Sequence, residues 1–252
     1  MKKTAFLFVF VLMIFICVKS YAGEKNAYLD FGFWNASLNI DAEEGKNSTT
    51  VDAINVLGVD DDKSIFTVSA GLNITGPFGL FGDFYSFSSS GSSELSQNIT
   101  FNEITFTKGS DVKGKFRHDY FKGGLRYRFV ENDNYYFNLR GGLNYNKMKV
   151  EISDSSQKTT GSVEVPFPFV GIELGGDLDY GFEWGGIVDG FAFSFDDDSV
   201  SYLDFNAFIK YRVNEIFNLK TGYKYENVDC EVDDDEYDAD TSGFYISANL
   251  TF

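Results

Sequence analysis

The chain has 252 residues and a net charge of −17, because 38 acidic residues outnumber 21 basic ones. This acidity argues against a nucleic-acid partner, because such partners need a basic stripe that neutralises their phosphates. After the first 22 residues no stretch approaches the roughly 18 consecutive apolar residues of a membrane-spanning helix.

The first residues are typical of a secretory signal. Lys2 and Lys3 precede an apolar run, and small residues lead to Ala22. The run is shorter than the roughly 20 residues that a spanning anchor needs. We therefore expect residues 1–22 to be a cleaved signal peptide and residues 23–252 to form one domain.

The remaining sequence has alternating apolar and polar residues with no helical periodicity, which predicts an all-β domain. The pattern favours ten strands of a closed antiparallel, up-and-down transmembrane β-barrel, with eight or twelve as alternatives. The expected strands are Ala27 to Ile40, Lys63 to Thr75, Gly79 to Ser88, Phe116 to Phe129, Tyr135 to Val150, Val163 to Leu178, Gly181 to Phe195, Val200 to Val213, Ile216 to Asn227 and Gly243 to Phe252.

The connections between these strands alternate in length. Short ones such as Asn214-Glu215 alternate with long ones such as Glu151 to Ser162 and Val228 to Ser242. Outer-membrane barrels have short periplasmic turns and longer external loops. The alternation therefore predicts that both termini are periplasmic and that the long connections are external loops.

Apolar and charged residues occupy opposite faces of several expected strands. Within Phe116 to Phe129, for example, Phe121 and Leu125 oppose Lys122 and Arg126. A periplasmic β-sandwich or a lipocalin-like barrel would show the same alternation with its apolar face inward. Long cations fit the lumen of a membrane barrel better than the surface of an otherwise acidic protein. The sequence therefore predicts an apolar face toward lipid and a charged lumen.

The charged face defines a candidate lumen charge network. Arg126, Arg140 and Glu173 fall at comparable heights on consecutive strands, which predicts a salt-bridge ladder. Four inward rings, those of Phe81, Tyr85, Phe169 and Phe208, are expected to narrow the bore further. The expected network is Lys122, Arg126, Arg128, Arg140, Glu173, Asp177, Asp204, Lys210, Arg212, Lys220, Lys224 and Glu226.

The last ten residues, GFYISANLTF, alternate strictly and end on an aromatic residue, Phe252. With the signal and the alternating strands, they make the chain resemble small bacterial outer-membrane β-barrel proteins, the class of small porins and OmpA-type anchors. The resemblance covers the whole mature chain and implies an outer-membrane location and an assembly signal at Phe252 read by the barrel-assembly machinery. It identifies an architecture and no single activity.

Two functional classes follow from this architecture. The first is a structural or adhesive barrel, or a narrow channel for small solutes. The second is an outer-membrane enzyme, a protease or lipid-modifying hydrolase, with a rim site near His118, the only histidine. Asp119 points away from His118, because adjacent strand residues alternate, and Ser88 or Ser90 would have to supply a partner. The sequence therefore favours a protein that is not an enzyme, with His118 as a hydrogen-bonded residue.

The acidic segment near residue 230 is the densest charge cluster. Its oxygen ligands suit divalent cations, although the glycine and glutamate spacing of a calcium-binding hand is missing. A solvated external loop explains the segment more simply. No cofactor is expected beyond loosely held Ca²⁺ or Mg²⁺, and the expected partners of a monomeric protein are outer-membrane lipid and lipopolysaccharide. The weak candidate ligands are Asp233, Asp234, Asp235 and Glu236.

Overall fold

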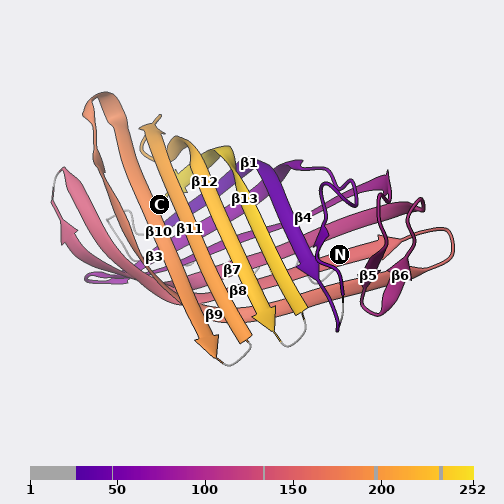
Figure 1. The fold of residues 1–252 in the computed structure, drawn as a ribbon. Coiled ribbons are helices and arrows are strands. Elements are labelled where there is room, and N and C mark those ends of the chain that lie inside the picture. The colour runs from indigo at the N-terminus through magenta and orange to yellow at the C-terminus, as the bar shows by residue number, and fades with distance from the viewer. Residues whose placement is uncertain (1–26, 47, 133, 196–197, 233–234) are drawn as a thin grey trace, which may run out of the picture.

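Ten long antiparallel strands close into a barrel in the computed structural model (Figure 1), which describes residues 27–252 except 47, 133, 196–197 and 233–234. The expected signal peptide lies outside the described residues. The barrel strands are β1 (Ala27–Glu43), β3 (Asp62–Thr75), β4 (Phe78–Glu94), β7 (Asp111–Glu131), β8 (Tyr135–Ser153), β9 (Lys158–Asp177), β10 (Phe182–Phe195), β11 (Asp198–Arg212), β12 (Phe217–Val232) and β13 (Asp235–Thr251). The minor elements are β2 (Val51–Asp52), the hairpin of β5 (Ile99–Phe101) and β6 (Ile104–Phe106), and a 3-10 turn at Asp179–Gly181.

The first and last strands close the barrel, as predicted. Strand β13 lies antiparallel between β12 and β1, with Tyr28 opposite Thr251 and Phe33 opposite Ile246. The ends are joined by two backbone hydrogen bonds between Ala27 and Phe252, at 3.2 and 2.9 Å. The terminal alternating strand therefore acts as the closing strand of an all-β, ten-stranded barrel.

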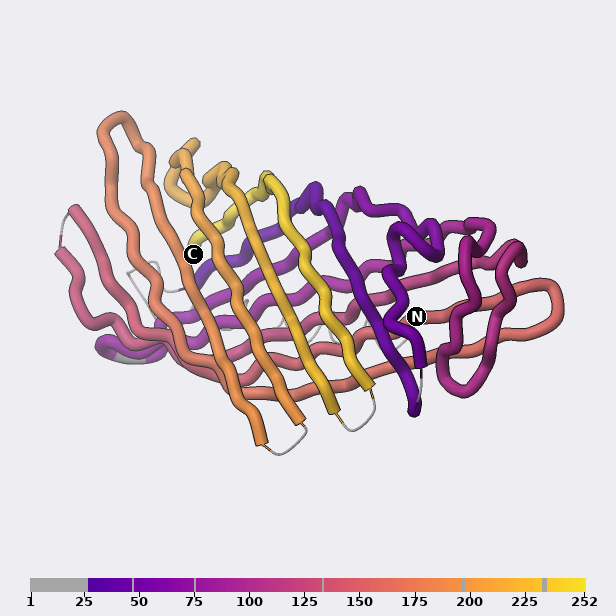
Figure 2. The backbone as a smooth tube through the Cα atoms, in the orientation of Figure 1, coloured from indigo at the N-terminus to yellow at the C-terminus, as the bar shows by residue number. Residues whose placement is uncertain are grey.

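Several strands are longer than predicted, and two predicted loops are largely strand. Most of the segment Val228 to Ser242 belongs to β12 and β13, and most of Glu151 to Ser162 belongs to β8 and β9. The prediction of long loops there was wrong, because the alternation continues beyond the lipid-facing band with its polarity reversed. The long hairpins are evident in the backbone trace (Figure 2).

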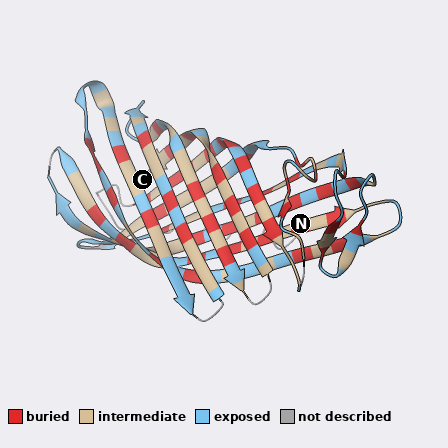
Figure 3. Cartoon of the chain, viewed as in Figure 1, coloured by how far each residue is buried: buried red, intermediate tan, exposed pale blue. Residues whose placement is uncertain are grey.

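Strand β8 shows this reversal clearly. Its outward residues from Tyr135 to Tyr145 are apolar or glycine, whereas the next ones, Lys147 and Lys149, are cations. Along the strands, buried and more accessible residues alternate (Figure 3). We call the part of the barrel from the short turns to the outward row of Phe84, Phe121 and Tyr145 the membrane zone, and the part beyond it the outer zone.

The membrane zone has the height of a bilayer core. From Tyr135 to Tyr145 the strand rises about 34 Å, which at a tilt of about 40° gives a band about 26 Å high. This matches the roughly 25 Å apolar band of outer-membrane barrels. In the described part of the chain, no helix is long and apolar enough to cross a membrane.

Segments from the long connections fill the inside of the outer zone. Gly58 lies so close to the inward face of β4 that a Cβ on Gly91 would stand 1.5 Å from its carbonyl oxygen, so only glycine fits there. The backbone amide of Leu95 bonds to the carbonyl oxygen of Ser110 at 3.0 Å, which brings the ends of the segment carrying β5 and β6 together. We call these segments the plug. Its buried apolar side chains are those of Ala53, Leu57, Val59, Leu95, Ile99, Phe101 and Phe106.

The pairing between β9 and β10 ends early, at Val170 opposite Gly190. Strand β9 continues beside β8 for many more residues, through Pro168 and Pro166. Because these prolines sit within a regular ladder to β8, their missing N–H groups fall on the side toward β10, where they interrupt the second ladder. The outer part of β9 therefore has one edge without a partner strand.

Candidate functional site: the bridged lumen

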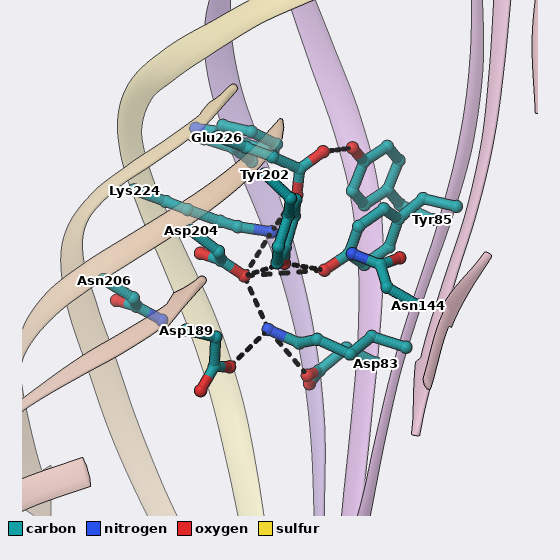
Figure 4. Close-up of polar contacts among 12 residues, drawn as sticks. Asp83, Tyr85, Asn144, Asp189, Tyr202, Asp204, Asn206, Lys224 and Glu226 are labelled. Atoms are coloured by element: carbon teal, nitrogen blue, oxygen red, sulfur yellow. Dashed lines mark hydrogen bonds and ion pairs between the residues drawn. The ribbon is translucent and has the colours of Figure 1, made fainter. Parts of the chain in front are cut away.

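A buried lysine lies at the centre of the lumen in the membrane zone. The Nζ of Lys122, on β7, lies 2.6 Å from Asp204 of β11 and 2.8 Å from Asp189 of β10. A third carboxylate, Asp83 of β4, lies 3.7 Å away. Figure 4 shows the three carboxylates converging from different strands. Lys122 therefore bridges the bore from one wall to the other.

Arg140 extends this arrangement toward the short turns. Its Nε lies 3.0 Å from Asp189, and its guanidinium lies 3.8 Å from the ring centre of Phe81. Glu173 lies 3.5 Å from Arg140 and 3.7 Å from Arg126. These contacts form the salt-bridge ladder predicted for the three residues.

Lys224 extends the arrangement toward the outer zone. Its Nζ lies 3.2 Å from Glu226 and 3.9 Å from Asp204. It also lies 4.8 Å from the ring centre of Trp34, in cation–π range. We call the connected set the lumen ion network; its members are Asp83, Lys122, Arg126, Arg140, Glu173, Asp189, Asp204, Lys224 and Glu226.

The signs of the charges alternate through the lumen ion network. Burying isolated charges costs several kcal/mol each, and close pairing with additional hydrogen bonds offsets that cost. The bidentate contact of Arg140 with Asp189 is of this kind, with Nε at 3.0 Å and Nη2 at 3.1 Å from carboxylate oxygens. Gly171 makes room for it, since a Cβ there would stand 2.1 Å from Asp189. The network therefore fixes opposite walls of the barrel to one another.

Aromatic hydroxyls and the histidine lie just beyond the ions. Tyr85 donates a hydrogen bond to Glu226, and its hydroxyl lies 3.4 Å from the Nδ1 of His118. The Nε2 of His118 lies 2.7 Å from the Oδ1 of Asn146. His118 is 1% exposed. The prediction that it lies at the external rim was wrong, because β7 continues beyond it to Asp111.

The serines considered as partners of His118 face the other way. Phe87 and not a serine stands opposite His118, while Ser88 pairs with Arg117 and Ser90 with Lys115 on the outward face. Around His118 the described neighbours are mainly aromatic rings, including Tyr85, Phe87 and Phe116. Neither Ser88 nor Ser90 is therefore placed as a nucleophile beside His118, and the hydroxyl of the inward Ser89 donates to the carbonyl oxygen of Asp60 at 2.8 Å.

Further out, the lumen becomes apolar. Phe116, Met148 and Val150 point inward from β7 and β8, and the buried plug residues pack against the same cluster. Figure 3 shows buried residues along the strands in this part of the molecule. Two different layers of buried side chains therefore lie inside the barrel: the lumen ion network in the membrane zone and an apolar core in the outer zone.

A cavity of about 300 Å³ extends from the turn side along the lumen ion network. Its walls carry both signs of charge, with Arg128 and Glu131 near the short turns and Tyr85 and Lys224 at its inner end. The cavity thus reaches the lumen ion network from the side of the termini.

The remaining charges predicted for the lumen lie nearer the turn side. Lys210 pairs with Glu183 at 2.6 Å, and Lys220 pairs with Asp30 at 3.4 Å. Arg128, Asp177 and Arg212 are on the same strand faces as the lumen residues, but they lie near the short turns and outside the lumen ion network. Their side chains are 33%, 55% and 54% exposed, and they form the ion pairs Arg128 with Glu131 and Asp177 with Arg212 at the edge of the barrel.

Two central carboxylates were missed by the sequence analysis. Asp83 lies between the inward residues Phe81 and Tyr85, so their predicted orientation already implied an inward Asp83. Asp189 lies in a glycine-rich stretch where alternation is weak. The four rings predicted to point inward, those of Phe81, Tyr85, Phe169 and Phe208, are all buried.

The candidate metal ligands do not form a site in the part of the chain that is described. Asp233 and Asp234 lie outside the described residues. Asp235 accepts a hydrogen bond from the amide of Gly45 at 2.8 Å, while its neighbour Glu236 points to the opposite face. Among the described residues no group of three or more histidine, cysteine or acidic side chains is placed to hold a metal ion. Cys230, expected in a loop, is a buried inward residue of β12.

The fold and its lipid-facing band define an outer-membrane β-barrel. No protein-family model and no curated protein matches the chain. Among solved structures, the outer-membrane protease OmpT from Escherichia coli is similar, with a TM-score of 0.57 and 11% identity over 90% of this chain and 97% of the protease.

Two other barrels are more distant. The translocator domain of the autotransporter NalP from Neisseria meningitidis has a TM-score of 0.46 and 10% identity, covering 100% of this chain and 98% of the domain. The attachment invasion locus protein Ail of Yersinia pestis, in complex with the heparin analogue sucrose octasulfate, has a TM-score of 0.41 and 13% identity, covering 90% and 99%. At such identities the likeness to OmpT is one of fold alone.

Proposed function

We propose that this protein is a closed outer-membrane barrel with a structural or adhesive role at the cell surface, and that it is not a solute channel. The observation that carries the proposal is the double closure of the bore. Lys122 joins β7 to β10 and β11 across the lumen, and the buried plug occupies the outer zone. A hydrated ion would have to break the first layer and then cross the second, which is apolar.

The environment of His118 supports a role without hydrolysis. A general base must reach its substrate within hydrogen-bonding distance. The ring of His118 is 1% exposed, and its nitrogens face Asn146 and Tyr85. A serine or carboxylate in contact with both His118 and solvent would be needed for the enzyme alternative.

The outer zone supports a role in display. From Tyr145 to Ser153 strand β8 continues about 27 Å along its length beyond the lipid-facing band. Its inward residues Met148, Val150 and Ile152 are buried, so this part has its own apolar core. A rigid projection of this kind presents a constant surface outside the membrane.

Conductance in planar bilayers tests the proposal. We expect the refolded wild-type protein to give no current steps. The variant Lys122→Ala/Asp204→Ala should also give none, because the apolar layer of the outer zone remains. Replacing residues 96–109 by a two-residue turn removes Ile99, Phe101 and Phe106 from the outer layer, and the turn can close the gap because Leu95 and Ser110 are already hydrogen-bonded. Combining both changes should produce current steps. Reproducible steps from wild-type protein, with folding verified by heat-dependent gel mobility, would overturn the proposal.

A further inference from the structure

One sector of the outer zone is basic, although the chain as a whole carries a charge of −17. The cations lie on the outward faces of β7, β8 and the start of β9, directly beyond the lipid-facing Phe121 and Tyr145. We call this the basic sector; its residues are Lys113, Lys115, Arg117, Lys147, Lys149 and Lys158.

The pairing register arranges these cations in rows. Lys147 lies opposite Asp119 in the row next to lipid, and Arg117 lies opposite Lys149 in the following row. Lys115 and then Lys113 continue the column on β7. Adjacent same-face residues on paired strands are close enough for one ligand to touch both.

Only part of this positive charge is neutralised within the protein. Arg117 pairs with Asp119 at 2.8 Å, Lys147 pairs with Glu164, and Lys158 pairs with Glu151 at 2.8 Å. In the described ranges no carboxylate lies within ion-pair distance of Lys113, Lys115 or Lys149. Among the described residues, three of the six cations of the basic sector therefore have no ion-pair partner.

Beside the cations, β4 presents a column of hydroxyls to the outside. Its outward residues next to the cations are serines, at positions 86, 88, 90 and 92, and they stand opposite β7 residues that include Arg117 and Lys115. The column ends at Glu94, which lies opposite Asp111. Cations together with hydroxyl donors are the groups that bind phosphate oxygens. This column is an observation independent of the positive charge.

The opposite side of the barrel has the reverse charge at the same height. On β12, β13 and β1 the register places Asp229, Asp238 and Asp41 side by side on the outward face. The next row consists of Glu231, Glu236 and Glu43. An anionic partner would therefore be drawn to one sector and repelled from the other.

The height of the basic sector above the lipid-facing band indicates which anionic partner it meets. The row of Arg117 and Lys149 lies four residues beyond Phe121 and Tyr145, about 13 Å along the strands or about 10 Å in height at the usual tilt. The headgroup layer begins at the edge of the hydrocarbon core and is about 5–8 Å thick. Lysine and arginine side chains can reach back toward that layer.

We propose that the basic sector, with the serine column of β4, binds the phosphate groups of the outer-leaflet glycolipid, lipopolysaccharide. The phosphates meet Arg117 and Lys149 while the acyl chains lie against Phe121 and Tyr145. Binding at this sector fixes the rotational orientation of the barrel relative to a lipid cluster, because the acidic opposite face repels the anionic phosphates. The proposal depends on the outer-membrane location and is independent of whether the bore conducts.

Equilibrium binding of purified bisphosphorylated lipid A to the folded protein in nonionic detergent, followed by native mass spectrometry, tests the proposal. We expect saturable binding, weakened about thirtyfold in Arg117→Gln/Lys149→Gln, since each cation near a charged lipid surface contributes about a fivefold step. Lys46→Gln/Lys108→Gln removes two exposed cations from turns away from the sector and should bind like wild type.

Chemical controls separate phosphate recognition from other attractions. Dephosphorylated lipid A should bind wild-type protein as weakly as lipid A binds the Arg117→Gln/Lys149→Gln variant. Equal affinity of that variant and wild type would overturn the proposal, as would equal affinity for the dephosphorylated lipid. Saturable binding of heparin without binding of lipid A would also overturn it and would assign the sector to a soluble polyanion. Heat-dependent gel mobility verifies that each variant is folded.

Discussion

Replacing Lys122 by methionine tests the structural role of the lumen ion network. Methionine keeps the length of the side chain and removes its charge. Lys122 is 2% exposed and has carboxylates at 2.6 and 2.8 Å, so its loss leaves two buried carboxylates with fewer partners. Removing one member of a buried ion pair costs about 3–5 kcal/mol. Arg140 and Lys224 still neutralise part of the remaining charge, which places the expected loss near the lower bound, about 3 kcal/mol.

Urea unfolding of the protein in lipid vesicles, followed by tryptophan emission, measures this loss. Trp34 reports on the lumen, because its ring lies 4.8 Å from the Nζ of Lys224. Lys158→Gln is the matched control: it breaks the 2.8 Å pair with Glu151, but the Lys158 side chain is 58% exposed. Such a surface pair contributes about 0–1 kcal/mol.

A double-variant cycle adds a second criterion. Asp204→Asn in the Lys122→Met background removes one of the stranded charges and should recover at least about 1 kcal/mol relative to the sum of the single losses. The reasoning would be refuted if Lys122→Met cost no more than Lys158→Gln. It would also be refuted if the cycle showed no coupling between Lys122 and Asp204.

Two further predictions concern the outward face. Leu143 is 64% exposed in the lipid-facing band, so Leu143→Arg should lower the free energy of unfolding in vesicles by about 2–4 kcal/mol, whereas Lys149→Arg should change it little; equal effects would contradict the placement of the band. In the outer zone, burial and then the like charges of Asp240 and its neighbours raise the pKa of Asp238 to about 6. This raised pKa opposes folding above pH 6, and protonation relieves the cost as the pH falls toward 4. Asp238→Asn should therefore stabilise the protein at pH 7, by less than about 1 kcal/mol after solvent screening, and should lose this advantage at pH 4. Thermal unfolding at both pH values measures the effect. A gain in stability that persists at pH 4 would contradict the raised pKa of Asp238 as its cause.

The architecture was largely predictable because a membrane barrel imposes one rule on every strand. Residues such as Leu139 and Leu143 must face lipid, so the opposite face, with Arg140, must face the lumen. The number of strands, the closing pair and the ladder to Glu173 follow from that rule. Each of these predictions needs only the facing of residues on strands that are adjacent in the sheet.

The polarity reversal hid the rest of the fold. In Val228 to Val232 the inward residues are apolar and the outward ones acidic, and the high charge density was interpreted as a loop. The bridges made by Lys122 were beyond sequence reasoning for a different reason. They join β7 to β10 and β11, and which residues meet across the bore depends on the stagger of the closed barrel.

The early end of the β9 and β10 ladder bears on self-association. An exposed strand edge is a template for a strand of another molecule, and proteins avoid this by proline and by covering the edge. Pro166 and Pro168 withhold two amide donors, and the side-chain amide of Asn102 donates to the carbonyl oxygen of Thr160 at 3.1 Å. At the crowded surface of a cell these three residues disfavour edge-to-edge aggregation. Replacing them would leave this strand edge with free backbone donors and acceptors toward a strand of another copy.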